Sequence, residues 1–443
     1  MKAPPDAVVI GAGHNGLVAA NVLADAGWSV LVLEAEPEPG GSVRSAELIE
    51  PGFVNDRFSA FYPLGAASPV FRALALDIPW RHGPLVLAHP SGDGSCPVIS
   101  RDVDETAASL GVDGERWHEL MRAWGRAEPA VLRGMTTPFP QLRAAFELGL
   151  EPSALRLLRP GFRGEHARRL LLGNALHTDI PPHSPLGRAF GLLLAAFGQQ
   201  HGFPCIEGGA GRLTGALVAR AVGRGVEIRC GERVERLARV RARRAVLAAV
   251  DAWTLARLLG RAPRTIPDPA TLKVDWTLDG PVPWLAENAR RAPVVHLGDE
   301  RAFTIFGQYS LADPTRMPAG KEVAWAYSHL LPDAGAIEDA IERLAPGFRS
   351  LIRGRHVTRL PPGRVNGGTM RLHNQLVFRG HFGRAETGVP GVYLASSSAH
   401  PGGGVHGAPG WIAARTALAH AARDSALRRR REPGAASFTN SST

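Results

Sequence analysis

The segment from residue 7 to residue 34 constrains the fold more than any other part of the chain. Residues 7–10 form a short apolar run, which is typical of a strand buried on both faces of a parallel sheet. The glycine pattern of residues 11–16 follows, then a helical run, and residues 29–33 are typical of a second strand that ends at Glu34. Strand, GxGxxG, helix, strand and acid stand in the order that a dinucleotide site requires.

The residue types of this segment suit such a site. Gly11 allows the tight turn, Gly13 lets the backbone approach a pyrophosphate, and Gly16 lets helix and strand pack closely. Phosphates lie at the helix N-terminus, where free N–H groups and the helix dipole favour negative charge. The carboxylate of Glu34 accepts hydrogen bonds from a ribose diol. The predicted cofactor-binding residues here are Gly11, Gly13, His14, Asn15, Gly16 and Glu34.

A second glycine-rich turn indicates which dinucleotide is bound. Gly40 and Gly41 directly follow the second strand, and Arg44 stands three residues further on. This arrangement suits FAD, whose pyrophosphate and ribitol run past such a loop. An ordinary surface turn with a solvated arginine is the alternative.

A third glycine-rich stretch lies near the other end of the chain. Residues 392–395 predict a strand, residues 400–410 a glycine-rich loop, and a helix is expected to begin near Trp411. Such a loop can place N–H groups and a positive helix end against the pyrimidine edge of a flavin, where reduction adds negative charge. A glycine-rich turn between domains is the alternative. The cofactor-binding residues predicted here are Ser397, Gly403, Val405 and His406.

With both ends considered, the chain resembles the phytoene-dehydrogenase-like (carotenoid desaturase-type) family of FAD-dependent oxidoreductases, near its branch of pyridine nucleotide-disulphide oxidoreductase domain-containing proteins. The resemblance implies noncovalent FAD, redox chemistry on a mostly apolar substrate, and contact of the Val234 backbone with the adenine. The family includes desaturases, isomerases and a saturase, so the reaction type stays open. The resemblance rests on residues 9–17, Glu34, and residues 39–41, 61–64, 207–209, 273–278, 366–368 and 400–404.

Two segments depart from the family pattern. The family usually has an additional strand-turn-strand after the part that matches residues 231–237, and here the chain passes to residues 245–250 without a turn residue. The stretch of residues 358–365 is also short. The loss of these segments weakens the expectation that the chain acts on the family's usual substrates, and it affects the expectation of FAD less.

The sequence predicts an α/β fold with a Rossmann-type FAD-binding domain and a discontinuous α+β substrate domain. Alternating residues 272–279 and 322–330 indicate half-buried strands of a mixed or antiparallel sheet, and residues 103–200 are mainly helical. The aromatic residues of these strands either line a substrate cavity or form plain core. We assign residues 1–75, 202–265 and 362–425 to the FAD domain, 76–201 and 266–361 to the substrate domain, and 426–443 to a disordered tail.

The amino-acid composition limits the classes of binding partner and the cellular compartment that can be expected for the protein. The net charge is +10, but the basic residues are spread along the chain without a stripe of interleaved aromatics, so no nucleic-acid partner is predicted. The three cysteines, Cys96, Cys205 and Cys230, lack metal-ligand spacing, so no metal is predicted and a reducing, cytoplasmic location is favoured. The apolar stretch at residues 189–198 is too short to span a membrane. A peripheral contact with an anionic membrane stays open.

Catalysis through a flavin needs no acid–base motif, because the cofactor carries the hydride. The predicted catalytic residues are therefore side chains expected near the flavin, namely His400, His406, His373 and Tyr62. For each histidine, a hydrogen bond to loop backbone is the alternative. We expect dehydrogenation or desaturation of an apolar or amphipathic small molecule. No second GxGxxG unit follows, so O₂ or a quinone would be the free electron acceptor. Amine oxidation, redox-neutral isomerisation with reduced FAD and a catalytically idle scaffold are the alternatives.

Overall fold

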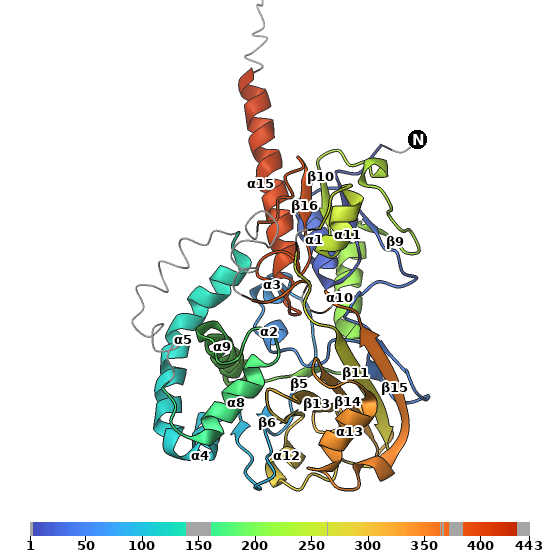
Figure 1. Ribbon diagram of the computed structural model, residues 1–443. Coiled ribbons are helices and arrows are strands. Elements are labelled where there is room, and N and C mark those ends of the chain that lie inside the picture. The colour runs from blue at the N-terminus through green and yellow to red at the C-terminus, as the bar shows by residue number, and fades with distance from the viewer. Residues whose placement is uncertain are drawn as a thin grey trace, which may run out of the picture.

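The computed structural model describes residues 3–138, 161–263, 265–363, 365, 367–371 and 384–431. It is a mixed α/β structure with a parallel sheet, a mainly antiparallel sheet and a group of helices (Figure 1). In the view of Figure 1 the parallel sheet lies at the upper right, the antiparallel sheet below it, and the helical group on the left. The predicted fold class is confirmed.

The parallel sheet collects strands from both ends of the chain. Among the described residues its order is β16-β10-β1-β2-β9, and all neighbours run parallel. Its central strand β1 is wholly buried, as the unbroken apolar run predicted. The strands are β1 (Ala7–Ile10), β2 (Val30–Leu33), β9 (Glu227–Arg229), β10 (Ala245–Ala248) and β16 (Val392–Leu394).

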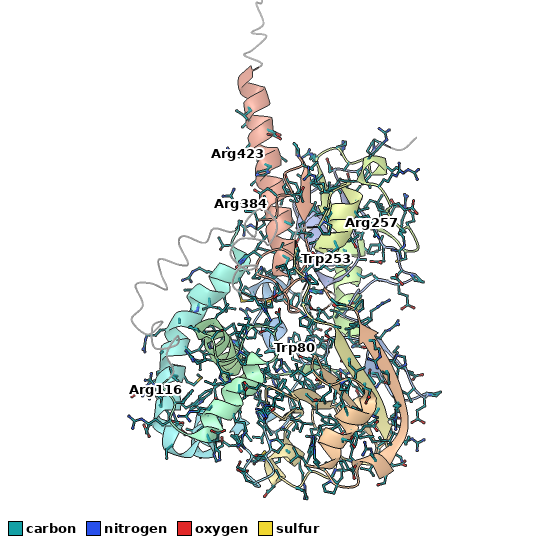
Figure 2. All side chains as sticks on the ribbon, in the orientation of Figure 1. Trp80, Arg116, Trp253, Arg257, Arg384 and Arg423 are labelled. Carbon is teal, nitrogen blue, oxygen red and sulfur yellow. The ribbon has the colours of Figure 1, made fainter. Side chains whose placement is uncertain are left out.

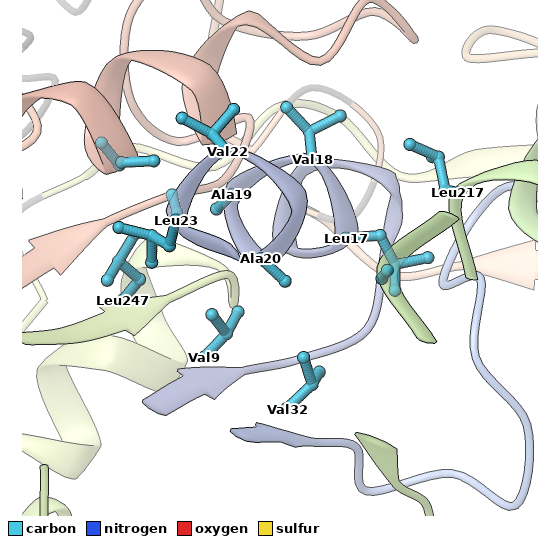
Figure 3. Packing of buried hydrophobic residues seen from close by; sticks show 14 of the residues in the cluster. Val9, Leu17, Val18, Ala19, Ala20, Val22, Leu23, Val32, Leu217 and Leu247 are labelled. Carbon is cyan, nitrogen blue, oxygen red and sulfur yellow. The ribbon is translucent and has the colours of Figure 1, made fainter. Parts of the chain in front are cut away.

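Three helices cover one face of this sheet: α1 (His14–Asp25), α10 (Gly211–Gly223) and α15 (Ala408–Arg431). Figure 3 shows Val9, Val32 and Leu247 of the sheet on one side of α1, with Val18 and Val22 on its other side. Because α1 packs on strands and on helices at once, almost all of it is buried. The start of the chain is thus held between segments that come much later in the sequence.

The second sheet has the order β15-β11-β14-β13-β12-β6-β7 among the described residues. Its neighbours are antiparallel except for β12 and β6. This matches the mixed or antiparallel sheet that the alternating segments predicted. The strands are β6 (Leu87–Ala88), β7 (Val98–Ile99), β11 (Thr271–Leu278), β12 (Val294–Leu297), β13 (Thr304–Gln308), β14 (Glu322–Ser328) and β15 (Ile352–Leu360).

The apolar residues of β11 and β14 lie on opposite faces of this sheet. Trp276 is fully buried against Phe306 and Phe348, beneath α13 (Ala334–Glu342). In the register, Asp275 stands opposite Trp325, so Trp325 faces away from Trp276 and toward the helical group. The two apolar stripes therefore form separate cores.

The helical group contains α4 (Val103–Ser109), α5 (Gly114–Thr136), α8 (Glu165–Ala175) and α9 (Pro185–His201). These helices pack through their apolar faces, as in the contact of the Trp124 ring with Phe197. None of the described helices has the length and apolar character that a membrane crossing requires.

Short elements complete the described part of the chain. They are β3 (Ser45–Ala46), β4 (Asn55–Asp56), α2 (Pro63–Ala66), α3 (Pro69–Ala73), β5 (Trp80–Arg81), η1 (Gly111–Asp113), β8 (Cys205–Ile206), η2 (Leu237–Arg239), α11 (Ala252–Leu258), α12 (Glu287–Arg291), η3 (Pro314–Arg316) and η4 (Phe348–Leu351).

The segment between β9 and β10 and the end of α15 can be compared with the sequence predictions. Between β9 and β10 the chain forms only the single turn η2 and no strand, in agreement with the missing strand-turn-strand. At the other end α15 continues to Arg431, so residues 426–431 are helical rather than part of the expected disordered tail. The remainder of that tail lies outside the described residues.

Candidate functional site: a dinucleotide cradle between two helix ends

The first two glycine-rich turns lie against each other. The N–H of Gly40 donates to the carbonyl of Ala12 over 2.8 Å, and Gly13 forms a bridge with Gly40. A side chain on Gly41 would approach the Cα of Gly13 to 3.1 Å, and the backbone of Gly41 has a φ of +57°. The two turns can be this close only because both are made of glycine, and together they offer bare backbone to a ligand.

The start of α1 lies close to the sheet. A Cβ on Gly16 would stand 2.1 Å from the carbonyl oxygen of Gly11, so only glycine fits there. No side chain caps this helix, and the first helical bond from residue 17 reaches Gly13, which leaves the N–H groups of the first turn free for phosphate.

The carboxylate of Glu34 is held in place at the end of β2. It accepts hydrogen bonds from the N–H of Ala12 over 2.6 Å and of Glu36 over 2.9 Å. Each carboxylate oxygen retains a lone pair for a ribose hydroxyl. Contact of Glu34 with a ribose stays a prediction.

The N-terminal ends of α1 and α15 meet at this site. A Cβ on Gly410 would stand 1.9 Å from the carbonyl oxygen of Asn15, so the two helices touch through glycine. The Oγ of Ser68 donates to the carbonyl of His406 over 2.7 Å, and the N–H of Ala408 donates to Nδ1 of His406 over 3.1 Å. Two positive helix ends thus converge, one from each glycine-rich fingerprint.

Buried polar atoms without a partner mark the space between these helix ends. They are Nε2 of His14, Oδ1 of Asn15 and Nε2 of His406. Burial lowers the pKa of His14 to about 4 and of His406 to about 3, so both rings are neutral at neutral pH. An unpaired buried polar group costs free energy, and FAD would supply the missing partners. The donors, the free helix ends and the glycine backbone together fit FAD.

Of the other predicted cofactor residues, Arg44, Gly403 and Val405 lie at the cradle, whereas Ser397 and Val234 have other neighbours. Nε of Arg44 donates to the carbonyl of Gly41 over 3.0 Å, so the arginine stays at the second glycine turn. Val405 packs on the core beneath the site, and Gly403 adjoins His406. Ser397 lies against Gly367, and Val234 packs with Leu31 and Leu33 on the other face of the sheet.

The predicted catalytic residues have different hydrogen-bond partners. Nε2 of His400 donates to the carbonyl of Gly134 on α5 over 2.9 Å, and His400 is close enough to His406 to contribute to the lowered pKa of that ring. Tyr62 is buried and its hydroxyl donates to the carbonyl of Ser59 over 2.7 Å, while burial raises its pKa above the usual value. His406 lies in the cradle. His373 lies outside the described residues.

Sequence reasoning missed a buried charged group on the antiparallel sheet. Nζ of Lys273 donates to the carbonyl of Asp56 over 3.0 Å and forms an ion pair with Asp275, with both side chains at most 3% exposed. Oδ2 of Asp275 has no partner, and burial raises the pKa of this carboxyl. In the sequence both residues occupy the charged positions of the alternating segment. Alternation predicted a half-buried strand with these positions exposed, so the burial of both faces of β11 was not predicted.

Beside this pair, Asp56 joins the two sheets. Its carboxylate accepts from the Tyr309 hydroxyl over 2.9 Å, from Arg316 over 2.9 Å and from the N–H of Ala210 over 2.7 Å. Arg316 is fully buried and also bonds Asp313. This network fixes the segment after the second glycine turn against the antiparallel sheet.

Aromatic side chains surround the same place. The Phe61 ring stacks on Tyr309 with centroids 5.4 Å apart and lies 6.1 Å from Trp325, which in turn stacks on Tyr327 at 5.9 Å. Nε1 of Trp325 has no hydrogen-bond partner although the residue is buried. We call Phe61, Tyr309, Trp325 and Tyr327 the aromatic wall.

The aromatic wall is connected to the cradle through α2. A Cβ on Gly404 would stand 2.9 Å from Leu64, and one on Gly65 would stand 3.0 Å from the carbonyl oxygen of Val405. Since Phe61 lies three residues before Leu64, the wall and the C-terminal glycine loop adjoin the same short segment. Among the described residues, no group of histidine, cysteine or acidic side chains could hold a metal ion, and the three cysteines are free.

Comparison with known proteins agrees with this geometry. The FAD dependent oxidoreductase family model matches residues 6–144. Pyridine nucleotide-disulfide oxidoreductase domain-containing protein 2 of Rattus norvegicus is 26% identical over 94% of this chain and 93% of its own length. Hydroxyneurosporene desaturase of Cereibacter sphaeroides is 30% identical over 57% of this chain and 54% of its own length.

Solved structures show the same fold. Cyclohexylamine oxidase of Brevibacterium oxydans has a TM-score of 0.58 at 16% identity, and the match covers 96% of this chain and all of that one. The family model and the cradle agree on FAD as the cofactor. The chain is similar to FAD-dependent oxidoreductases over residues 6–144, and over a longer stretch it is similar to a carotenoid desaturase-type enzyme.

Proposed function

We propose that the protein dehydrogenates an apolar or amphipathic small molecule, which passes a hydride to FAD. The observation that carries this proposal is the aromatic wall, which adjoins the C-terminal glycine loop through α2. Aromatic side chains bury large apolar areas and suit a substrate without charge. Two relatives are named for hydroxyneurosporene and limonene, so these two compounds are the first candidates.

When bound, FAD supplies the hydride acceptor, and the chain positions the reactants. Nδ1 of His406 accepts the N–H of Ala408, so in the neutral ring the proton is on Nε2, which is free to donate. Together with the N-terminus of α15, this donor would stabilise the negative charge that a bound flavin gains on reduction. The low pKa of His406 favours this role over proton removal from the substrate.

The proton that leaves the substrate with the hydride needs a separate acceptor. Two buried ion pairs lie beside the aromatic wall, Asp56 with Arg316 and Asp275 with Lys273. Of their carboxylates, Asp275 has an unpartnered oxygen, Oδ2. We assign proton transfer to the Asp275–Lys273 pair, with Lys273 holding the carboxylate in place. His400 is bonded to α5 and Tyr62 to Ser59, so they serve as positioning residues in this scheme.

The remaining assignments complete the proposal. Residues 1–75, 202–265 and 362–425 bind FAD, and residues 76–201 and 266–361 bind the substrate. The electron acceptor is a free O₂ or quinone molecule, and the protein works in the cytoplasm or at the surface of a membrane.

Amine oxidation is a second candidate, because Trp325 and Tyr327 form a stacked pair with an interplanar angle of 7°. An aromatic pair that flanks the flavin would suit an amine oxidase. The two candidates differ in substrate charge, since an amine has to lose its proton before oxidation. Two carboxylates lie at the aromatic wall: Asp56 is already paired with Arg316, and Asp275 is the one with an unpartnered oxygen.

The test begins with the visible spectrum before and after denaturation, where release of FAD into the supernatant is expected. Anaerobic mixing with limonene, a hydroxylated carotenoid precursor or primary amines then follows flavin bleaching. Bleaching by the hydrocarbons alone supports dehydrogenation, and bleaching by amines alone supports the second candidate. Isomerisation that starts only after dithionite reduction would replace both, and a protein that takes up FAD without any of these reactions would be an idle scaffold.

A further inference from the structure

A cavity of about 380 Å³ lies on the face of the parallel sheet opposite α1. Its walls come from the segment between β9 and β10, the yellow-green loop at the upper right of Figure 1. The volume is within the usual range of small-molecule sites. This is the segment from which the family's strand-turn-strand is missing, so a loop replaces a sheet above these strands.

The floor of the cavity is apolar. Val8, Leu31 and Leu33 alternate along β1 and β2 and point to this face, and Val234 and Val240 add to it from the loop. Leu31 and Leu33 are only half-buried, although their neighbours Val30 and Val32 on the α1 side are buried. Apolar surface therefore remains for a ligand to cover.

The rim of the cavity is strongly basic: Arg229, Arg233, Arg236, Arg239 and Arg241 line it, against two acids, Glu232 and Glu235. Arg229 is paired with Glu227 over 2.8 Å, and Arg233 lies 3.6 Å from Glu36. Within the described chain no ion pair neutralises Arg236, Arg239 or Arg241. Guanidinium groups at one rim repel each other until an anion arrives, and they bind carboxylate or phosphate with two parallel hydrogen bonds.

We propose that this cavity is a second ligand site, which binds an amphiphilic anion, a carboxylate or phosphate joined to an apolar body. The apolar part covers the floor, and the anion lies at Arg236, Arg239 and Arg241. A neutral hydrocarbon would leave the guanidinium groups unpaired, and a cation would be repelled. The inference does not depend on the proposed reaction.

The site is coupled to the FAD cradle through backbone hydrogen bonds. The N–H of Glu232 donates to the carbonyl of Glu34 over 2.8 Å, and the N–H of Glu34 donates to the carbonyl of Arg229 over 2.8 Å. The cavity wall therefore holds the residue that bonds the ribose. A ligand that orders this wall will raise the affinity for FAD, and FAD will raise the affinity for the ligand by the same factor.

The experiment titrates the FAD-loaded protein with 11-(dansylamino)undecanoate, whose fluorescence rises in an apolar site. Competitors are dodecanoate, dodecyl phosphate, inorganic phosphate, adenosine monophosphate and dodecyltrimethylammonium. The variants are Arg236→Glu/Arg239→Glu, which reverses the rim charge, and Val240→Trp, which fills the cavity. Arg257→Glu is the matched control, an exposed arginine on α11 outside the cavity (Figure 2).

We expect the probe to bind, both cavity variants to weaken it about tenfold or more, and the control to stay within about twofold. Dodecanoate and dodecyl phosphate should displace the probe, and their relative strength identifies carboxylate or phosphate as the anion. Equal binding to all variants, or displacement by the cationic amphiphile, would overturn the proposal. So would displacement by inorganic phosphate or by adenosine monophosphate at the concentrations at which dodecanoate acts. The flavin spectrum of each variant shows separately whether the protein is folded and holds FAD.

Discussion

Trp276 and Trp325 stand on neighbouring strands of one antiparallel sheet, on opposite faces, and both are buried. Nε1 of Trp276 donates to Glu338 over 3.0 Å, whereas Nε1 of Trp325 has no partner. Beside Trp325, Oδ2 of Asp275 is also unpartnered. The face of Trp276 is a closed core under α13. The face of Trp325 has buried polar atoms without hydrogen-bond partners, which a bound ligand could satisfy. Four substitutions test this difference.

The largest effect is expected from Lys273→Met. This change leaves the carboxyl of Asp275 buried without its partner, and the free energy of unfolding should fall by about 3–5 kcal/mol. Urea denaturation of the FAD-loaded protein measures the loss. The double variant Lys273→Met/Asp275→Leu should recover most of it, since no buried charge remains. A single variant as stable as the parent would show that the pair is solvated.

Glu322 gives a pH dependence at the edge of the closed face. Burial raises its pKa from 4.5 to about 7, so the folded protein holds this proton more tightly than the unfolded chain does. Its contribution to stability is therefore complete below pH 4.5 and is lost as the pH rises through 7, by about 3 kcal/mol. Glu322→Gln should remove this part of the slope in urea melts between pH 5 and pH 8. An unchanged slope would contradict the assignment.

Trp276→Phe should lower the free energy of unfolding by about 1–3 kcal/mol, because Glu338 loses a buried donor. The flavin spectrum and the rate of flavin reduction by substrate should not change, since this face is closed. A variant that is stable but slow would mean that the closed face reaches the substrate.

Trp325→Phe is the matched change on the other face. It removes an N–H without a partner, so stability should change by less than about 1 kcal/mol. The rate of anaerobic flavin reduction by substrate should fall severalfold, because the aromatic wall is altered. Equal rates in Trp325→Phe and the parent protein would remove the wall from the proposed substrate site.

Much of the cofactor region could be predicted because its signals are local. Gly16, Glu34 and the apolar run of β1 stand in one short unit, and backbone sterics leave few other folds for it. The meeting of His14 with the C-terminal glycine loop followed from the need for both fingerprints to contact one cofactor.

The contacts around the antiparallel sheet were harder to predict from the sequence, since they join residues that are far apart in the chain. Alternation identified β11 and β14 as strands, but it does not say which faces coincide, and register alone places Asp275 beside Trp325. The Asp56–Arg316 pair joins residues far apart in the chain, and no spacing indicates it. His400 was predicted beside the flavin, and only the path of the loop shows that it bonds α5.

The contact between Gly410 and Asn15 also has a consequence for synthesis. During translation β1 and α1 emerge first. The strand β16, which completes their sheet, and the helix α15, which covers α1, emerge only after the antiparallel sheet and the helical group have been made. The nascent parallel sheet therefore has an exposed apolar surface while the antiparallel sheet and the helices fold beside it. FAD gains its full set of contacts only when α15 packs against α1, so cofactor binding is a late step in the folding of this protein.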